Sequence, residues 1–146
     1  MNHKNVLSNE ELERLNKYFR VSNYIGASCL FLQDNVLLKR PLEFKDIKAR
    51  LVGHWGSGPG QSFIFTHLNR IINKYDLNMI YIVGPGHGGQ AALTNAYLEG
   101  SLTEIYPEYT QDEKGLTLLC KKFSFPKGFS SHVSPEVPGS IHEVES

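Results

Sequence analysis

Apolar side chains recur at helical spacing over most of the chain, which predicts a largely helical molecule. The periodic segments cover residues 9–32, 59–74, 90–99 and 111–122, with a shorter candidate at 43–51. Ser8 and Glu11 have the spacing of a capping box, Pro59 suits a first helical turn, and Gly100 suits a helix C-terminus. The Pro-, Gly- and Ser-rich stretch from Ser124 onward is predicted to be loop.

Residues 79–83 break this pattern, because Met-Ile-Tyr-Ile-Val is a short, continuous apolar run. Such a run is typical of a parallel strand that is covered on both faces. A buried strand needs neighbours on both edges for its N–H and C=O groups, and the sequence has no second comparable run. We therefore predict an α/β fold of which this chain is an incomplete piece, mostly helices and loops around one strand, with its sheet partners elsewhere.

The composition argues against several classes of partner. Of 146 residues, 40% are hydrophobic and 21% charged, and the 15 basic and 15 acidic side chains give a formal net charge of zero. This balance gives no indication of binding to nucleic acid or to a membrane. Cys29 and Cys120 lie in apolar surroundings outside any CxxC pattern and are interpreted as reduced core residues. With no signal-peptide pattern at the N-terminus, these features favour the cytoplasm.

The residues that could act chemically lie mostly in two glycine-rich turns, at residues 53–60 and 84–89. The second turn follows the predicted strand, and open α/β sheets bind ligands at that end. His54 and His87 lie in these turns, and His132 lies in a similar Ser-rich context. Imidazole suits proton transfer and phosphate binding, whereas no histidine pair has a spacing typical of a metal site. From the turn alone, a tight strand-to-helix connection with an incidental histidine remains the alternative.

Together, these segments resemble the signatures of the phosphoketolase family. The first is Leu-Val-Gly-His-Trp-Gly at 51–56, with Pro-Gly at 59–60 and His-Leu-Asn-Arg at 67–70, and the second is Gly-Pro-Gly-His-Gly-Gly at 84–89. The third comprises Phe-Ser-Phe-Pro at 123–126, Ser-His-Val at 131–133 and Pro-Gly-Ser-Ile-His-Glu at 138–143. Three signatures in the same order, spread over nearly the whole chain, are highly specific.

The resemblance implies an enzyme related to transketolases that uses thiamine diphosphate and a divalent metal, usually magnesium. Such enzymes cleave xylulose 5-phosphate, and often fructose 6-phosphate, with inorganic phosphate to acetyl phosphate and an aldose phosphate, and they form homo-oligomers. Residues 9–146 would be the N-terminal part of their parallel-sheet cofactor domain, of the diphosphate-binding type, after a disordered segment 1–8. The resemblance assigns catalytic roles to His54, His87 and His132, substrate contacts to His54 and His132, and cofactor contacts to Gly86 and His87.

The sequence also departs from the family pattern. Ser57 and Gly58 stand where the family usually has two threonines, and Gln90 stands where it usually has proline. The Gly-Asp-Gly segment that holds the cofactor diphosphate and metal, and the glutamate that activates the thiazolium ring, have no counterpart in this sequence. We therefore expect a truncated chain that is inactive alone.

Two other functions are alternatives to a catalytic part. One is a non-catalytic remnant that binds a full-length phosphoketolase. The other is an independent histidine-based hydrolase, for which Ser57 and Ser131 are the candidate nucleophiles.

Overall fold

A computed structural model of the chain describes residues 7–140, and the regular elements within them are helical. They are α1 (Asn9–Phe31), the 3₁₀ turn η1 (Phe44–Asp46), α2 (Gly58–Tyr75), the 3₁₀ turn η2 (Gly86–Gly88), α3 (Gly89–Glu99), α4 (Ser101–Ile105) and α5 (Glu113–Lys122). The four long helices predicted from periodicity are confirmed, with ends that shift by at most two residues. Helix α4 was not predicted, because five residues are too few to show a helical period.

Local capping explains where α1 begins and α3 ends. The Ser8 hydroxyl accepts a hydrogen bond from the Glu11 N–H at 3.1 Å, and the Glu11 carboxylate accepts one from the Ser8 N–H at 3.0 Å. This second bond is the main reason that the pKa of Glu11 is lowered. Gly100 ends α3 with a φ of 94°, a left-handed conformation that glycine adopts readily. Both sequence signals are therefore confirmed.

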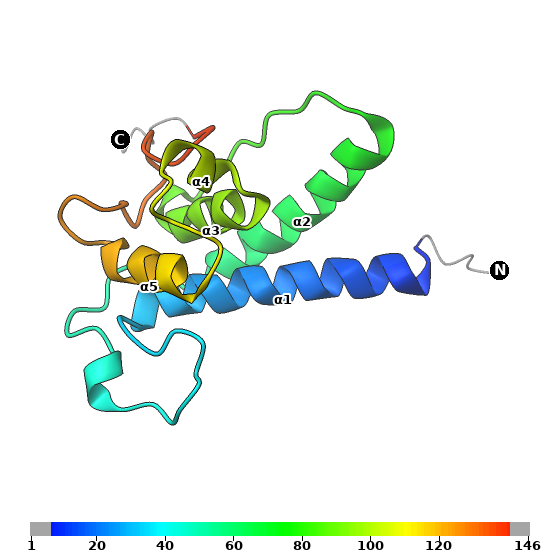
Figure 1. Cartoon of the computed structure of the whole chain (residues 1–146). Coiled ribbons are helices and arrows are strands. Elements are labelled where there is room, and N and C mark those ends of the chain that lie inside the picture. Colours follow the sequence, from blue (N-terminus) through cyan, green and yellow to red (C-terminus); the bar gives the residue numbers. More distant parts are fainter. Residues whose placement is uncertain (1–6, 141–146) are drawn as a thin grey trace.

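Helix α1 is the longest element, and α2, α3 and α5 lie against it (Figure 1). It packs against α2, α3 and α5, while α3 also packs against α2 and α4. The apolar core draws side chains from α1, α3, α4, α5 and the loop after α5, among them Ile25, Leu93, Leu102, Leu119 and Phe129. No helix within residues 7–140 combines the length and the apolar character needed to cross a membrane.

The two cysteines lie in this core. Cys29 and Cys120 are both free, each is fully buried, and their Sγ atoms are 3.9 Å apart. The contact with Cys29, followed by burial, raises the pKa of the Cys120 thiol. The interpretation of both cysteines as reduced core residues is confirmed.

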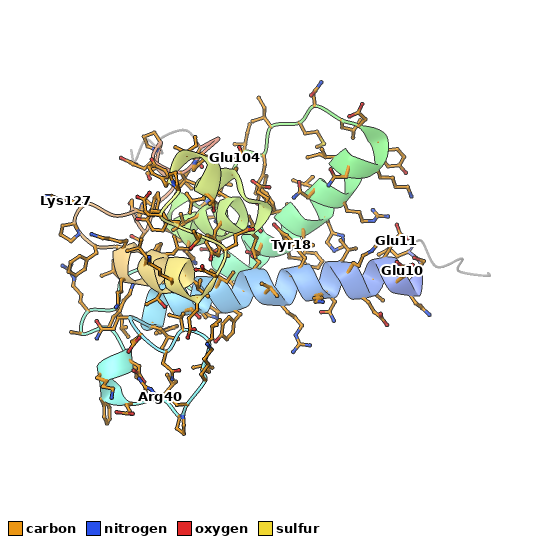
Figure 2. The ribbon with its side chains drawn as sticks, in the orientation of Figure 1. Glu10, Glu11, Tyr18, Arg40, Glu104 and Lys127 are labelled. Carbon is orange, nitrogen blue, oxygen red and sulfur yellow. The ribbon has the colours of Figure 1, made fainter. Side chains whose placement is uncertain are left out.

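A buried polar network joins α1, α2 and α3. The Ser22 hydroxyl lies 2.9 Å from that of Ser62, and the Tyr18 hydroxyl donates to Asn95 Oδ1 at 3.1 Å. Figure 2 shows Tyr18 on the side of α1 that faces these helices. Burial raises the pKa of Tyr18 to about 12. Because each group has a partner on another helix, the network fixes how the three helices meet.

The strand predicted at residues 79–83 is not formed. The segment runs in an extended arc from the far end of α2 back to α3 (Figure 1), and Ile80 and Ile82 are 87% and 85% exposed. The one β-type pairing in residues 7–140 is an isolated bridge between Leu32 and Ile47. A strand needs a neighbouring strand to accept and donate its backbone hydrogen bonds, and the described chain supplies none. The structure is mostly helical without a sheet, so the α/β class is not observed in this part of the chain.

The short helix predicted at 43–51 is also wrong, because only the η1 turn forms there. The Asp46 carboxylate accepts a hydrogen bond from the Glu43 N–H at 2.9 Å, which caps the turn. The backbone beyond it then pairs with the end of α1, since the Lys48 N–H donates to the Phe31 carbonyl at 2.9 Å. Local side-chain bonds of this kind compete with helix formation.

Two predictions concern the ends of the chain. Disorder was expected for residues 1–8, but Ser8 is held in place as the N-cap of α1. Residues 1–6 lie outside the described residues, as does His142 of the third signature, so the predictions for them stay untested.

Candidate active site

The loop between η1 and α2 carries His54 and is fixed at several points. Lys48 Nζ donates to the Cys29 carbonyl at 2.6 Å and to the Phe123 carbonyl at 3.0 Å, which ties the loop to the ends of α1 and α5. Burial lowers the pKa of the Lys48 amine. Gly53 has a φ of 131°, and a Cβ there would lie 2.2 Å from a side-chain carbon of α1. The close approach of this loop to α1 therefore requires glycine at position 53.

His87 lies in the η2 turn, directly before α3. The Gly88 N–H donates to the Pro85 carbonyl at 3.0 Å, and the Gly86 N–H donates to the Gly84 carbonyl at 3.1 Å. These short-range bonds bend the backbone tightly, so that Gly86 and Gly88 are buried while His87 is half-buried.

The loop after α5 brings His132 against the same turn. The Val133 N–H donates to the Gly86 carbonyl at 2.9 Å. A Cβ at Gly89 would lie 2.3 Å from the carbonyl carbon of His132, so the two backbones can meet only because residue 89 is glycine. The His132 N–H donates to Ser130 Oγ at 3.1 Å, which stabilises the local bend.

These three segments bring the predicted histidines together. The ring centroids of His54 and His87 are 4.5 Å apart, and those of His54 and His132 are 6.4 Å apart. His54 is exposed, whereas His87 and His132 are half-buried. The expected convergence is present, although the segment before the second turn is not a strand. The chemical roles of the three imidazoles stay predictions.

Two glutamines lie beside the histidine cluster, and the sequence analysis did not predict either as a site residue. Gln61 Nε2 donates to the Pro85 carbonyl at 2.7 Å, and Gln90 Nε2 donates to the His54 carbonyl. Their side chains are buried, with exposures of 5% for Gln61 and 1% for Gln90. Neither residue belongs to a motif, and the only sequence signal was that Gln90 replaces the proline usual in the family that the chain resembles.

A groove of about 620 Å³ opens beside the cluster, between α2, α3 and the extended arc 79–83. Gly86 lines it together with mostly apolar side chains such as Phe65 and Ile72. Among the lining residues that the structure describes, Glu99 is the one side chain charged at neutral pH, and none is lysine or arginine. A carboxylate repels a diphosphate, which is bound in proteins by basic side chains and backbone N–H groups. The groove therefore does not fit the charged end of thiamine diphosphate.

The described residues form neither a metal site nor an activated serine beside the histidines. Within residues 7–140 no three His, Cys, Asp or Glu side chains gather in a way that could hold a metal ion. Ser57 Oγ is buried and has no hydrogen-bond partner. It therefore lacks the bond to a base that activates a serine nucleophile.

Closely spaced imidazoles can donate a proton at one ring while they accept one at another, and when charged they bind anions. A cluster of this kind, carried on glycine turns over a helical scaffold, is chemically capable of acid–base catalysis and of binding an anion. Residues 6–145 match the family described as the XFP N-terminal domain, and the chain belongs to this family.

Several phosphoketolases are similar to the chain over nearly its whole length. It is 56% identical to a probable phosphoketolase of Rhodopirellula baltica over 137 residues, which are 94% of this chain and 17% of that protein. It is 55% identical to the xylulose-5-phosphate phosphoketolase of Lactiplantibacillus pentosus over 132 residues, 90% of this chain and 17% of that protein. The chain thus spans 17% of the length of these relatives. The resemblance noted in the sequence is confirmed.

Proposed function

We propose that this chain supplies the histidine-bearing part of a phosphoketolase active site. Such an enzyme cleaves xylulose 5-phosphate or fructose 6-phosphate with inorganic phosphate, giving acetyl phosphate and a shorter aldose phosphate in carbohydrate metabolism. The observation that carries the proposal is the cluster of His54, His87 and His132, with ring centroids 4.5 and 6.4 Å apart. Both reactants are anions, which charged imidazoles bind, and the cleavage requires proton transfers, which imidazoles perform.

The three histidines have different surroundings, which support different roles. His54 is the exposed member, so with His132 it is suited to bind the incoming sugar phosphate. His87 is half-buried next to Gly86 and is suited to contact the cofactor and to move protons during cleavage and loss of water.

Other parts of the enzyme complete the site in this proposal. Thiamine diphosphate, with magnesium, supplies the carbanion chemistry when bound, and segments beyond this chain hold its diphosphate. Residues 79–83 pair there with strands of the same domain, which gives the α/β, parallel-sheet fold. The exposure of Ile80 and Ile82 supports this pairing, because a contiguous apolar surface usually marks an interaction site. The cytoplasm is the proposed location.

A second candidate is a non-catalytic role in which the chain binds a full-length phosphoketolase. The same extended segment favours it, since residues 79–83 are in no β pairing within the described chain and Ile80 and Ile82 are exposed, so the segment can add to a sheet edge. Co-purification of the tagged chain with a full-length phosphoketolase would support this role. Capture that persists after Ile80→Lys would count against the segment as the contact.

The catalytic proposal is tested in a hybrid enzyme. This chain replaces the matching segment of the Lactiplantibacillus pentosus relative, with which it shares 55% identity over 132 residues. Changing His54, His87 or His132 to Ala should reduce acetyl phosphate formation by about 10²–10⁴-fold, as is typical when an acid–base group is lost. His67→Ala is the matched control, because the His67 ring contacts Phe63 of its own helix, with ring centroids 4.6 Å apart, outside the cluster.

Denaturant unfolding of each hybrid separates loss of chemistry from loss of fold. We expect the midpoints of the three variants to stay close to that of the parent hybrid, because loop histidines among glycines contribute little core packing. Near-normal product formation by all three histidine variants would overturn the proposal.

A further inference from the structure

Two buried glutamines connect the turns that carry His54 and His87. Gln61 lies in the first turn of α2, and Gln90 lies in the first turn of α3. Gln61 Nε2 reaches the carbonyl of Pro85, two residues before His87, at 2.7 Å. Gln90 Nε2 reaches the carbonyl of His54 itself. Each glutamine thus bonds to the turn at the start of the other helix.

Glycines make room for both side chains. A Cβ at Gly88 would lie 2.3 Å from Gln61 Nε2, and a Cβ at Gly58 would lie 2.4 Å from Gln90 Nε2. Gly58 begins α2, the helix that carries Gln61, and Gly88 directly precedes α3, the helix that carries Gln90. The arrangement is therefore reciprocal, because a glycine at the start of each helix leaves space for the glutamine side chain of the other helix.

We propose that Gln61 and Gln90 are positioning residues, a glutamine clamp that sets the distance between the imidazoles of His54 and His87. Both amides are buried, so each replaces water as the donor to a loop carbonyl. With the clamp closed, the two turns cannot slide past each other, and the ring centroids stay 4.5 Å apart. The inference rests on the proposed function only in taking these two imidazoles as the groups whose spacing matters.

The clamp is tested by removing each donor while keeping the length of the side chain. Gln61→Met and Gln90→Met keep an unbranched side chain of similar size but cannot donate to the carbonyl. Gln111→Met is the matched control, since Gln111 Nε2 also donates to backbone carbonyls, of Tyr97 at 2.7 Å and Leu98 at 3.0 Å, away from the histidines.

The readout is the nuclear Overhauser cross-peak between the ring protons of His54 and His87 in the 146-residue chain with isotope-labelled histidine. This signal falls steeply with distance and is independent of turnover. We expect it in the parent and in Gln111→Met, and we expect its loss in Gln61→Met and Gln90→Met while core cross-peaks persist. If both clamp variants keep the His54–His87 cross-peak, the proposal is overturned.

A second pair of variants decides the matter if a glutamine variant does not fold. Gly58→Ala does not change Gln90 itself, but the added methyl group would occupy the space of the Gln90 amide. Gly60→Ala, on the same helix, adds a methyl group that meets nothing within 4 Å. We expect the cross-peak to be lost in Gly58→Ala and kept in Gly60→Ala, and an unchanged cross-peak in Gly58→Ala would overturn the clamp. The hybrid-enzyme assay of the histidine variants tests the proposed function separately, so either idea can fail without the other.

Discussion

At the residue scale, Asp46 shows how a buried charge is held by its partners. Its side chain is fully buried and accepts two hydrogen bonds from the Arg40 guanidinium, at 2.6 and 2.7 Å, and one from the Glu43 N–H at 2.9 Å. Figure 2 shows Arg40 on the loop that follows α1, away from the crossing of the helices. The bond from Arg40 is the main reason that the pKa of Asp46 is lowered, with the backbone bond adding to it.

This pairing predicts a pH dependence of stability. Because the pKa of Asp46 is lower in the folded state than in the unfolded chain, its ionisation stabilises the fold above about pH 4, and that stability is lost as the pH falls through the folded pKa. Arg40→Met should reduce the free energy of unfolding at pH 7, because it leaves a buried carboxylate without its cation. The same substitution should also weaken the pH dependence of the free energy of unfolding below pH 4. Urea titrations from pH 3 to pH 7 measure both.

Arg14→Met is the control for Arg40→Met. Arg14 pairs with Glu10 at 3.9 Å, with both side chains mostly exposed, so the substitution should change the free energy of unfolding by less than about 0.5 kcal/mol. Equal changes in the free energy of unfolding for the two substitutions would show that the Arg40–Asp46 pair stabilises the fold no more than an exposed ion pair does.

At the element scale, the extended segment 79–83 has the composition of a buried strand but the environment of an exposed loop. Ile80→Lys and Ile82→Lys should each change the free energy of unfolding of this chain by less than about 0.5 kcal/mol, because both side chains face solvent. Leu93→Ala, in the core of α3, should cost about 2–5 kcal/mol, since it leaves a cavity. Denaturant unfolding compares the three.

In the hybrid enzyme the same two lysine substitutions should behave differently. There the segment is proposed to be a covered strand, so a lysine would bury an unpaired charge and reduce the yield of folded enzyme. If Ile80→Lys destabilises the isolated chain as much as Leu93→Ala does, the segment is already packed and the interpretation is wrong.

At the scale of the whole molecule, residues 7–140 bring three histidines together, and the groove beside them has no basic side chain among its described lining residues that could hold a diphosphate. We predict that the purified chain makes no detectable acetyl phosphate from xylulose 5-phosphate and phosphate, even with thiamine diphosphate and magnesium present. The described residues that line the groove beside the histidines include Glu99 and no basic side chain, so they give the cofactor diphosphate no cationic partner. A hydroxamate assay and a calorimetric titration with thiamine diphosphate are the measurements, with the Lactiplantibacillus pentosus relative as positive control. Turnover above background, or binding in the micromolar range, would reveal a complete site in this chain.

The sequence by itself predicted the four long helices and the three histidines that the structure brings together. The start of α1 and the end of α3 were predictable from Ser8, Glu11 and Gly100, because helix hydrogen bonds and caps join residues a few positions apart. His54 and His87 were recognisable because glycine-rich turns constrain the backbone locally, whatever surrounds them.

Tertiary structure alone decided what depends on partners distant in the chain. Residues 79–83 have strand composition, yet they form no strand, because a strand takes its hydrogen bonds from another segment and none of residues 7–140 provides one. The spacing of His54 and His87 likewise depends on Gln61 and Gln90, which bond across separations of 24 and 36 residues. No local pattern encodes such bonds, since each amide finds its carbonyl only after α2 and α3 have packed together.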